Sequence, residues 1–119
     1  MYLAEHLEDD EGVRHPMVGL LPSTVRMRPR RLTLGYTEVT LVRDTVLGPA
    51  GTVARGHEFH VSTLDPVPST VARAYRLAGA SAERVEGFVV GSALLSYVHL
   101  HFASNPAVAT AFVDACARP

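Results

Sequence analysis

The sequence of 119 residues contains no lysine, no tryptophan and a single cysteine, Cys116. One cysteine excludes an intrachain disulfide and leaves too few thiols for a cysteine-built zinc site, which favours a reducing compartment such as the cytoplasm. The absence of lysine excludes a lysine that acts as a base or forms a Schiff base. Every fixed positive side-chain charge therefore comes from arginine.

The chain also lacks an excess of charge and a long hydrophobic run. Its 11 basic and 12 acidic residues leave a net charge of -1, which gives no general attraction to nucleic acid or to an anionic membrane. The longest nearly apolar run, residues 87–95, is too short to cross a bilayer, and the first residues do not resemble a secretory signal. We expect one cytoplasmic domain at most, without a nucleic-acid or membrane partner.

Hydrophobic alternation predicts a chain that is rich in β-strands. Leu32, Leu34 and Tyr36 alternate with polar residues and the phase then shifts, which predicts a strand over residues 31–43 with a bulge or bend near Gly35. Other expected elements are a turn at 47–51, strands at 16–21, 52–63, 84–90 and 93–102, a loop at 65–69, a turn at 91–92, and a helix or strand at 70–77. The strands on either side of the turn at 47–51 are expected to form a hairpin.

Helices are expected at the two ends of the chain. Residues 2–7 can place their apolar side chains on one face, and the acidic cluster at 8–11 followed by Gly12 would end that helix. Asn105 and Pro106 predict the start of the last helix, because asparagine caps well and proline suits the first helical position. The expected apolar face of this last helix consists of Ala107, Ala111, Phe112 and Ala115.

The sequence His-Glu-Phe-His at residues 57–60 does not fit a metalloprotease helix, which needs two histidines four residues apart. On a strand, the odd spacing sends His57 and His60 to opposite faces. By itself the segment favours a structural role, in which Glu58 pairs with Arg55 or Arg43 and one histidine is a satisfied core residue. A role of His57 and Glu58 in a cleft stays open.

The sequence Tyr-Val-His-Leu-His-Phe at residues 97–102 places His99 and His101 two residues apart, and therefore on one face of a strand. A histidine near a strand end can act as a general base or activate a thiol. It can also bind a metal with a further ligand from elsewhere, or lie buried with its ring bonded to the backbone. Spacing alone leaves these three readings open.

Three further features favour structural explanations. The arginine-rich run at residues 26–31 has no flanking aromatic residues, so a solvated edge or loop is favoured over an anion site. Gly48, Gly51 and Gly56 do not form a phosphate-binding fingerprint and are interpreted as turn residues. Cys116 lies in the last predicted helix and is interpreted as a small packing residue, not a nucleophile.

Four segments carry a family resemblance. They are His-Pro-Met-Val-Gly-Leu-Leu-Pro at 15–22, Arg-Leu-Thr-Leu-Gly-Tyr at 31–36, Arg-Gly-His-Glu-Phe-His-Val-Ser at 55–62 and Ser-Tyr-Val-His-Leu-His-Phe-Ala-Ser-Asn-Pro at 96–106. In this order they resemble the C-terminal part of the glutaminase domain of cobyrinate and hydrogenobyrinate a,c-diamide synthases. The third segment followed by the fourth is the specific combination, and it distinguishes this family from the similar cobyric acid synthases.

The resemblance implies an α/β fold, namely an incomplete class I glutamine amidotransferase-like (flavodoxin-like) domain over residues 1–119. This chain would supply its strand-rich C-terminal half and terminal helix. In that family a cysteine thiolate attacks the side-chain amide of L-glutamine, and backbone amides hold the oxyanion. His99 matches the catalytic histidine, which takes the thiol proton and then protonates the leaving ammonia. The motifs imply supporting or pocket-forming roles for His57, Glu58, His60 and His101, and no carboxylate that orients His99 is assigned.

The same resemblance implies that important parts lie outside this sequence. The family's nucleophile sits in a Glu-Cys-Gly-Gly elbow shortly before Met-Tyr-Leu, and this chain begins with Met-Tyr-Leu. Cys116 matches the far helix instead, so we expect no glutaminase activity from the chain alone. ATP, Mg²⁺ and the corrinoid substrate would belong to a synthetase domain, and we expect no cofactor or metal in this chain.

Two other functions stay open at this point. The chain could be a non-catalytic binding or regulatory module, or a subunit of a split enzyme, that docks on a polypeptide supplying the N-terminal half and its cysteine. It could also bind a metal through His57, His60, His99 and His101.

Overall fold

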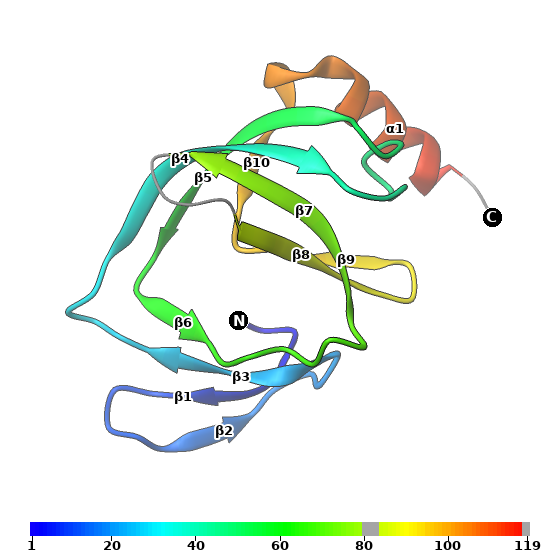
Figure 1. The fold of residues 1–119 in the computed structure, drawn as a ribbon. Coiled ribbons are helices and arrows are strands. Elements are labelled where there is room, and N and C mark those ends of the chain that lie inside the picture. The colour runs from blue at the N-terminus through cyan, green and yellow to red at the C-terminus, as the bar shows by residue number, and fades with distance from the viewer. Residues whose placement is uncertain (80–83, 118–119) are drawn as a thin grey trace.

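Strands make up most of the computed structural model, which describes residues 1–79 and 84–117. Within these residues one sheet has the order β2-β1-β3-β6 and a larger one has the order β10-β5-β4-β7-β8-β9 (Figure 1). The strands are β1 (Ala4–Glu8), β2 (Arg14–Pro16), β3 (Leu21–Met27), β4 (Thr33–Leu41), β5 (Val53–His60), β6 (Ser62–Leu64), β7 (Ala72–Gly79), β8 (Arg84–Val90), β9 (Ala93–Leu95) and β10 (His99–His101). A 3-10 helix, η1 (Phe102–Ser104), and the helix α1 (Pro106–Cys116) follow. The expected strand-rich α/β class with a terminal helix is confirmed.

The first segment of the smaller sheet corrects the expected helix at residues 2–7, because Ala4–Glu8 is strand β1. β1 pairs in parallel with β3 and antiparallel with β2, so that its backbone is bonded on both sides. A short helix without an N-cap, ending in acidic residues that oppose its dipole, has little intrinsic stability. Pairing with residues farther along the chain therefore determines that this segment is a strand and not a helix.

The strand expected at residues 16–21 is also wrong. β2 ends at Pro16 and β3 begins at Leu21, and Val18 between them is 52% exposed. The backbone amides of this connection bond back to carbonyls of residues 2–5, at 2.8 to 3.2 Å. The apolar run is thus an irregular connection along β1, and its backbone groups are satisfied without a ladder.

Arg26 on β3 forms ion pairs with one residue of β1 and with one residue that directly follows β6. Its guanidinium donates to both carboxylate oxygens of Asp65 at 2.8 and 2.9 Å, and also to Glu8. These bonds lower the pKa of Asp65 and raise that of Arg26. The expected solvated edge or loop is therefore wrong for Arg26, which lies in a strand paired on both sides, but it is correct for the exposed arginines at residues 28, 30 and 31.

The expected hairpin is confirmed as β4 and β5, whose pairing runs without a register shift from Thr33 opposite His60 to Thr40 opposite Val53. The expected bulge near Gly35 is therefore wrong. The phase shift in the sequence has another cause, because apolar residues occupy both faces of β4. Leu34 and Tyr36 point outward and are 67% and 90% exposed, whereas Val39 is buried on the inner face.

Two predicted strands are each divided in two. Of the ambiguous segment at residues 70–77, residues 72–77 belong to strand β7. The strand expected at 52–63 breaks after His60, and β6 then pairs with β3 in the smaller sheet. The strand expected at 93–102 breaks between β9 and β10, where the Ser96 hydroxyl accepts the backbone N–H of Val98. The predicted loop at 65–69 and the turn at 91–92 are confirmed.

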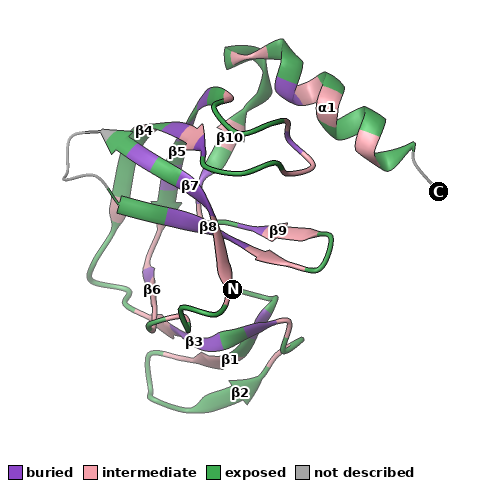
Figure 2. Ribbon diagram, turned by 45° about the vertical axis from the view of Figure 1, so that its right-hand side comes forward, coloured by how far each residue is buried: buried purple, intermediate pink, exposed green. Residues whose placement is uncertain are grey.

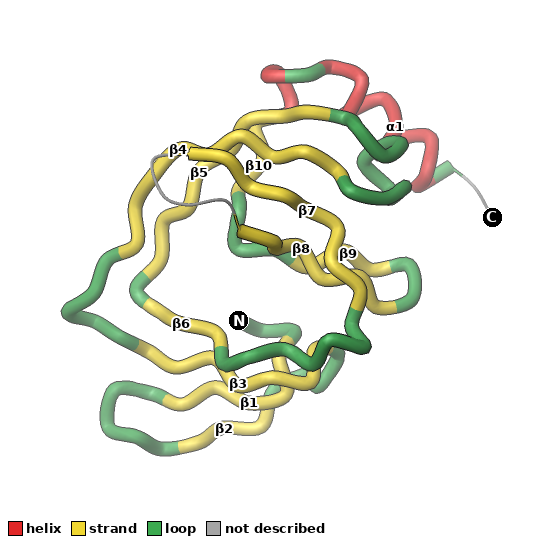
Figure 3. Tube along the Cα trace, in the orientation of Figure 1, coloured by secondary structure: helices red, strands yellow, loops and turns green. Residues whose placement is uncertain are grey.

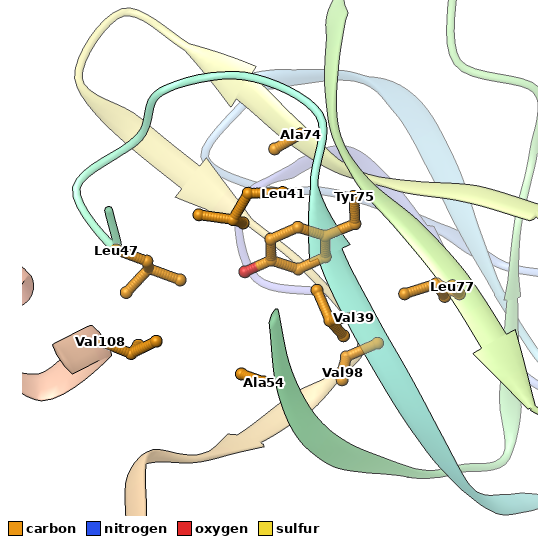
Figure 4. Close-up of a cluster of buried hydrophobic side chains, with 9 residues drawn as sticks. All are labelled: Val39, Leu41, Leu47, Ala54, Ala74, Tyr75, Leu77, Val98 and Val108. Carbon is orange, nitrogen blue, oxygen red and sulfur yellow. The ribbon is translucent and has the colours of Figure 1, made fainter. Parts of the chain in front are cut away.

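The main core lies against the inner face of the larger sheet, where Tyr75 of β7 is its largest fully buried side chain. The other buried members are Val39, Leu41, Leu47, Ala54, Ala74, Leu77, Val98 and Val108 (Figure 4). Figure 2 shows buried residues along β7 and β8, whereas β2 is exposed throughout. Burial raises the pKa of the Tyr75 phenol, because it disfavours the phenolate.

The terminal helix starts as expected, with the Asn105 side chain accepting the Ala107 N–H at 3.1 Å and Pro106 in the first turn. Its buried contact differs from the expected apolar face, because Val108 is buried while Phe112 is 41% exposed. α1 appears at the end of the chain in Figure 3. In the described part of the chain, no helix combines the length and hydrophobicity that a membrane span requires.

Candidate functional site

Histidines from the two histidine motifs meet on the outer face of the larger sheet. β10 pairs with β5 so that His99 lies opposite His57, and β4 places Tyr36 on the other side of His57. The ring centroids of His57 and His99 are 5.0 Å apart, and those of Tyr36 and His57 are 6.5 Å apart. Tyr36, His57 and His99 therefore form a row across three strands, called here the aromatic row. All three side chains are exposed.

His101 lies on the same face as His99, as its spacing predicts. Both histidines are exposed, so the reading in which one of them is a buried core residue is wrong. His101 pairs with Arg55 across the strands, and the Arg55 Nε lies 3.9 Å from the Glu38 Oε2. A polar row thus runs beside the aromatic row, and this exposed ion pair contributes little to stability.

Gly56 explains how β10 comes so close to β5. It lies in the middle of β5 opposite Leu100, so its interpretation as a turn residue is wrong. A Cβ atom at this position would lie 2.6 Å from the His99 carbonyl oxygen and 2.7 Å from a Val98 methyl group. The absence of a side chain therefore permits the strand spacing that holds His99 beside His57.

Glu58 and His60 lie on the inner side of β5, so the odd spacing of His57 and His60 places them on opposite faces as predicted. Glu58 is 6% exposed, and its carboxylate pairs with Arg84 of β8. The expected partners Arg55 and Arg43 are wrong, since Arg55 projects from the outer face of the same strand. The contacts of Glu58 thus run to β8 and to His60, on the side of the sheet away from His99.

His60 packs its ring on Tyr97, with ring centroids 4.3 Å apart. Its Nδ1 donates to the Ser62 carbonyl oxygen at 2.8 Å, because a carbonyl can only accept a hydrogen bond. Its Nε2 is buried without a hydrogen-bond partner and lies 3.5 Å from the Glu58 Oε1. His60 thus belongs to the interior between the two sheets.

Glu86 of β8 is a second buried carboxylate, and the sequence pattern gives no reason to single it out. It is 6% exposed and accepts hydrogen bonds from the Ser96 hydroxyl and the Tyr97 N–H. Burial, opposed in part by these bonds, raises its pKa. Glu58, His60 and Glu86 line a cavity of about 440 Å³ between the two sheets.

Replacing Glu86 by glutamine is expected to stabilise the fold at neutral pH by roughly 1 kcal/mol, because a buried charge is removed. The amide oxygen can still accept the Tyr97 N–H, and the amide nitrogen can donate to the Ser96 hydroxyl. A raised folded-state pKa contributes stability below the unfolded pKa of about 4.3 and loses it as the pH rises through the folded value. The gain from Glu86→Gln should therefore shrink as the pH falls through the folded-state pKa, and it should be lost by about pH 4. Urea denaturation at several pH values measures it. The exposed Glu5→Gln is the control, and a loss of stability at pH 7 for Glu86→Gln would contradict the expectation.

The structure separates the side chains of the metal-binding alternative. His60 lies on the inner side of the sheet, whereas His57, His99 and His101 are on the outer face. Among the residues described, no group of three or more His, Cys, Asp or Glu side chains could hold a metal ion. Cys116 is exposed on α1, which corrects its interpretation as a packing residue. It borders a cavity together with Val98 and Leu100, whose side chains belong to the inner side of the sheet.

Comparison with known proteins identifies the context of this site. Residues 1–107 match the family model described as the CobB/CobQ-like glutamine amidotransferase domain. The cobyrinate a,c-diamide synthase of Syntrophotalea carbinolica is 43% identical over 98% of this chain and 26% of its own length. That of Leptospira interrogans is 39% identical over 99% of the chain and 27% of its own length. The hydrogenobyrinate a,c-diamide synthase of Streptomyces coelicolor is 45% identical over 85% of the chain and 20% of its own length. The chain thus spans about a quarter of the length of its first two relatives.

Proposed function

The chain belongs to the CobB/CobQ-like glutamine amidotransferase family, and from this membership we propose that it supplies the histidine-bearing part of a glutaminase. The relatives are named cobyrinate and hydrogenobyrinate a,c-diamide synthases. We propose that the complete enzyme is an ATP-dependent ligase that amidates the a and c carboxylates of one of these two substrates. The observation that carries the proposal is the aromatic row, which presents His99 to solvent beside His57.

In the proposed reaction His99 acts as the general base and acid. It takes the proton of a cysteine thiol, and the thiolate adds to the side-chain amide carbon of L-glutamine. The protonated imidazole then gives its proton to the leaving nitrogen, so that ammonia departs and a thioester remains. Water hydrolyses the thioester to glutamate and restores the thiol. The exposed position of His99 leaves its ring accessible for these transfers.

The neighbours of His99 receive supporting roles in this proposal. His57 packs against the His99 ring and limits its orientation, while Tyr36 packs against the far edge of His57. His101 lies two residues farther along the same face, where it can border the glutamine pocket. Glu58 and His60 act from the inner side, because the Glu58–Arg84 ion pair ties β5 to β8.

We infer that the nucleophile comes from outside the described residues. Cys116 borders the inner-side cavity together with Leu100, whereas His99 projects from the outer face of the same strand. We therefore assign the thiol to a polypeptide segment beyond this chain. We likewise assign ATP, Mg²⁺ and the corrinoid substrate to a synthetase domain of the complete enzyme, which would work in the cytoplasm.

We expect the purified 119-residue chain to release no ammonia from L-glutamine. Activity should appear after mixing with a Syntrophotalea carbinolica cobyrinate a,c-diamide synthase that lacks the part matching this chain. His99→Ala should then lower the rate of ammonia release by about 10²- to 10⁴-fold, the usual contribution of a general acid–base group. A coupled glutamate dehydrogenase assay measures the ammonia.

The control for His99→Ala is His15→Ala. His15 is half-exposed in β2, where its ring bonds to Asp9, and its loss should leave the rate unchanged. Activity of the isolated chain that depends on His99 would show that the nucleophile lies within the chain. Full activity of the mixed sample with His99→Ala would overturn the catalytic role of this histidine.

A further inference from the structure

The outer face of β4, β5 and β10 carries a large apolar area next to His99. Leu34 of β4 lies opposite Phe59 of β5, and the pair borders the aromatic row. Leu34 is 67% exposed, Phe59 60% and Tyr36 90%. Single exposed apolar residues are ordinary, but adjacent large ones on one sheet face mark an interaction surface. We call Leu34, Tyr36 and Phe59 the apolar patch.

Nothing in the described part of the chain covers this patch. The helix α1 packs on the opposite side of the sheet, since Val108 joins the buried cluster of Val39 and Ala54. The inner face of these strands is therefore covered by the core, whereas their outer face is exposed to solvent. β5 shows this most clearly, because its residues alternate between exposed and buried from Val53 to Phe59.

The patch and the aromatic row form one continuous surface. Tyr36 belongs to both, and Phe59 and His57 project from the same side of β5. A hydrolytic histidine needs its nucleophile within hydrogen-bond reach. The cysteine of this chain borders the inner-side cavity, so whatever presents a nucleophile to His99 has to lie over the outer face.

We propose that the apolar patch is the docking surface for the polypeptide segment that presents the nucleophile to His99. This inference rests on the proposed glutaminase function and adds the location of the contact. The segment carries apolar side chains that cover Leu34, Tyr36 and Phe59. It belongs to the roughly three quarters of the relative's length that this chain does not match.

The test measures binding and activity separately in the mixed sample described above. Phe59→Asp and Leu34→Asp place a charge in the patch without touching His99. Each should weaken binding of the truncated relative at least tenfold by analytical ultracentrifugation. Val85→Asp, at a 63% exposed strand position on β8, is the matched control and should change binding less than twofold. Circular dichroism checks that every variant is folded.

The outcomes separate this proposal from the glutaminase function. His99→Ala should keep full binding and lose ammonia release, because it removes chemistry and not the apolar contact. Binding that tolerates Phe59→Asp and Leu34→Asp, or no binding at all, overturns the docking surface. Self-association of the chain that disappears with Phe59→Asp, without binding of the relative, assigns the patch to a second copy and also overturns it. Normal docking without ammonia release would instead refute the glutaminase function.

Discussion

Replacing Gly56 by alanine is expected to lower the free energy of unfolding by about 2–3 kcal/mol and to move the His99 ring away from His57. The added Cβ would lie 2.6 Å from the His99 carbonyl oxygen, and backbone cannot rotate away as a side chain can. β10 has to move outward as a strand, which weakens its pairing with β5 at His57, Gly56 and Arg55. Urea denaturation measures the stability, and the nuclear Overhauser effect between the two imidazoles reports their separation.

Gly35→Ala is the matched control, because Gly35 lies in the same hairpin opposite Glu58 and has no atom within 4 Å of an added Cβ. This variant should change stability by less than about 0.5 kcal/mol. Equal effects of the two substitutions would show that the loss comes from glycine's general flexibility. An unchanged imidazole contact in Gly56→Ala would show that β10 is positioned by something other than its close approach to β5.

Local sequence patterns predict those parts of the fold that depend on interactions between residues close together in the sequence. The hairpin of β4 and β5 follows from alternation on both sides of a Gly-Pro-Ala-Gly turn. The start of α1 follows from Asn105, whose cap needs only the next two residues. The opposite faces of His57 and His60, and the shared face of His99 and His101, follow from the parity of their spacing on strands.

The parts that local patterns could not predict depend on partners far away in the sequence. Glu58 pairs with Arg84, 26 residues away, and no pattern near Glu58 favours that arginine over Arg55. Arg26 bonds to Asp65, 39 residues away, which places it in an ion-paired sheet and not in a loop. β1 is a strand because β2 and β3 lie on either side of it. The role of Gly56 could be recognised only once β10 was known to pair with β5. The one local signal for it was its position within a histidine motif.

Replacing Gly87 by alanine is expected to lower the free energy of unfolding by about 3–5 kcal/mol, because two unfavourable effects add there. Gly87 of β8 has a φ of +69°, a conformation that costs an L-residue about 1–2 kcal/mol. The added Cβ would also lie 2.8 Å from the Tyr75 ring, which is fully buried. Thermal and urea denaturation of the variant measure the sum.

The two effects can be separated within the same chain. Gly91 has a φ of +58° and no atom within 4 Å of an added Cβ, so Gly91→Ala should cost only the backbone term of about 1–2 kcal/mol. In a Tyr75→Leu background, which removes the ring, Gly87→Ala should fall to a similar cost. Persistence of the full loss in that background would show that the strain is in the backbone alone. If both the backbone cost and the contact cost are found, the absence of a side chain at Gly87 is what makes room for the Tyr75 ring. The packing of the core under the larger sheet then depends on this glycine.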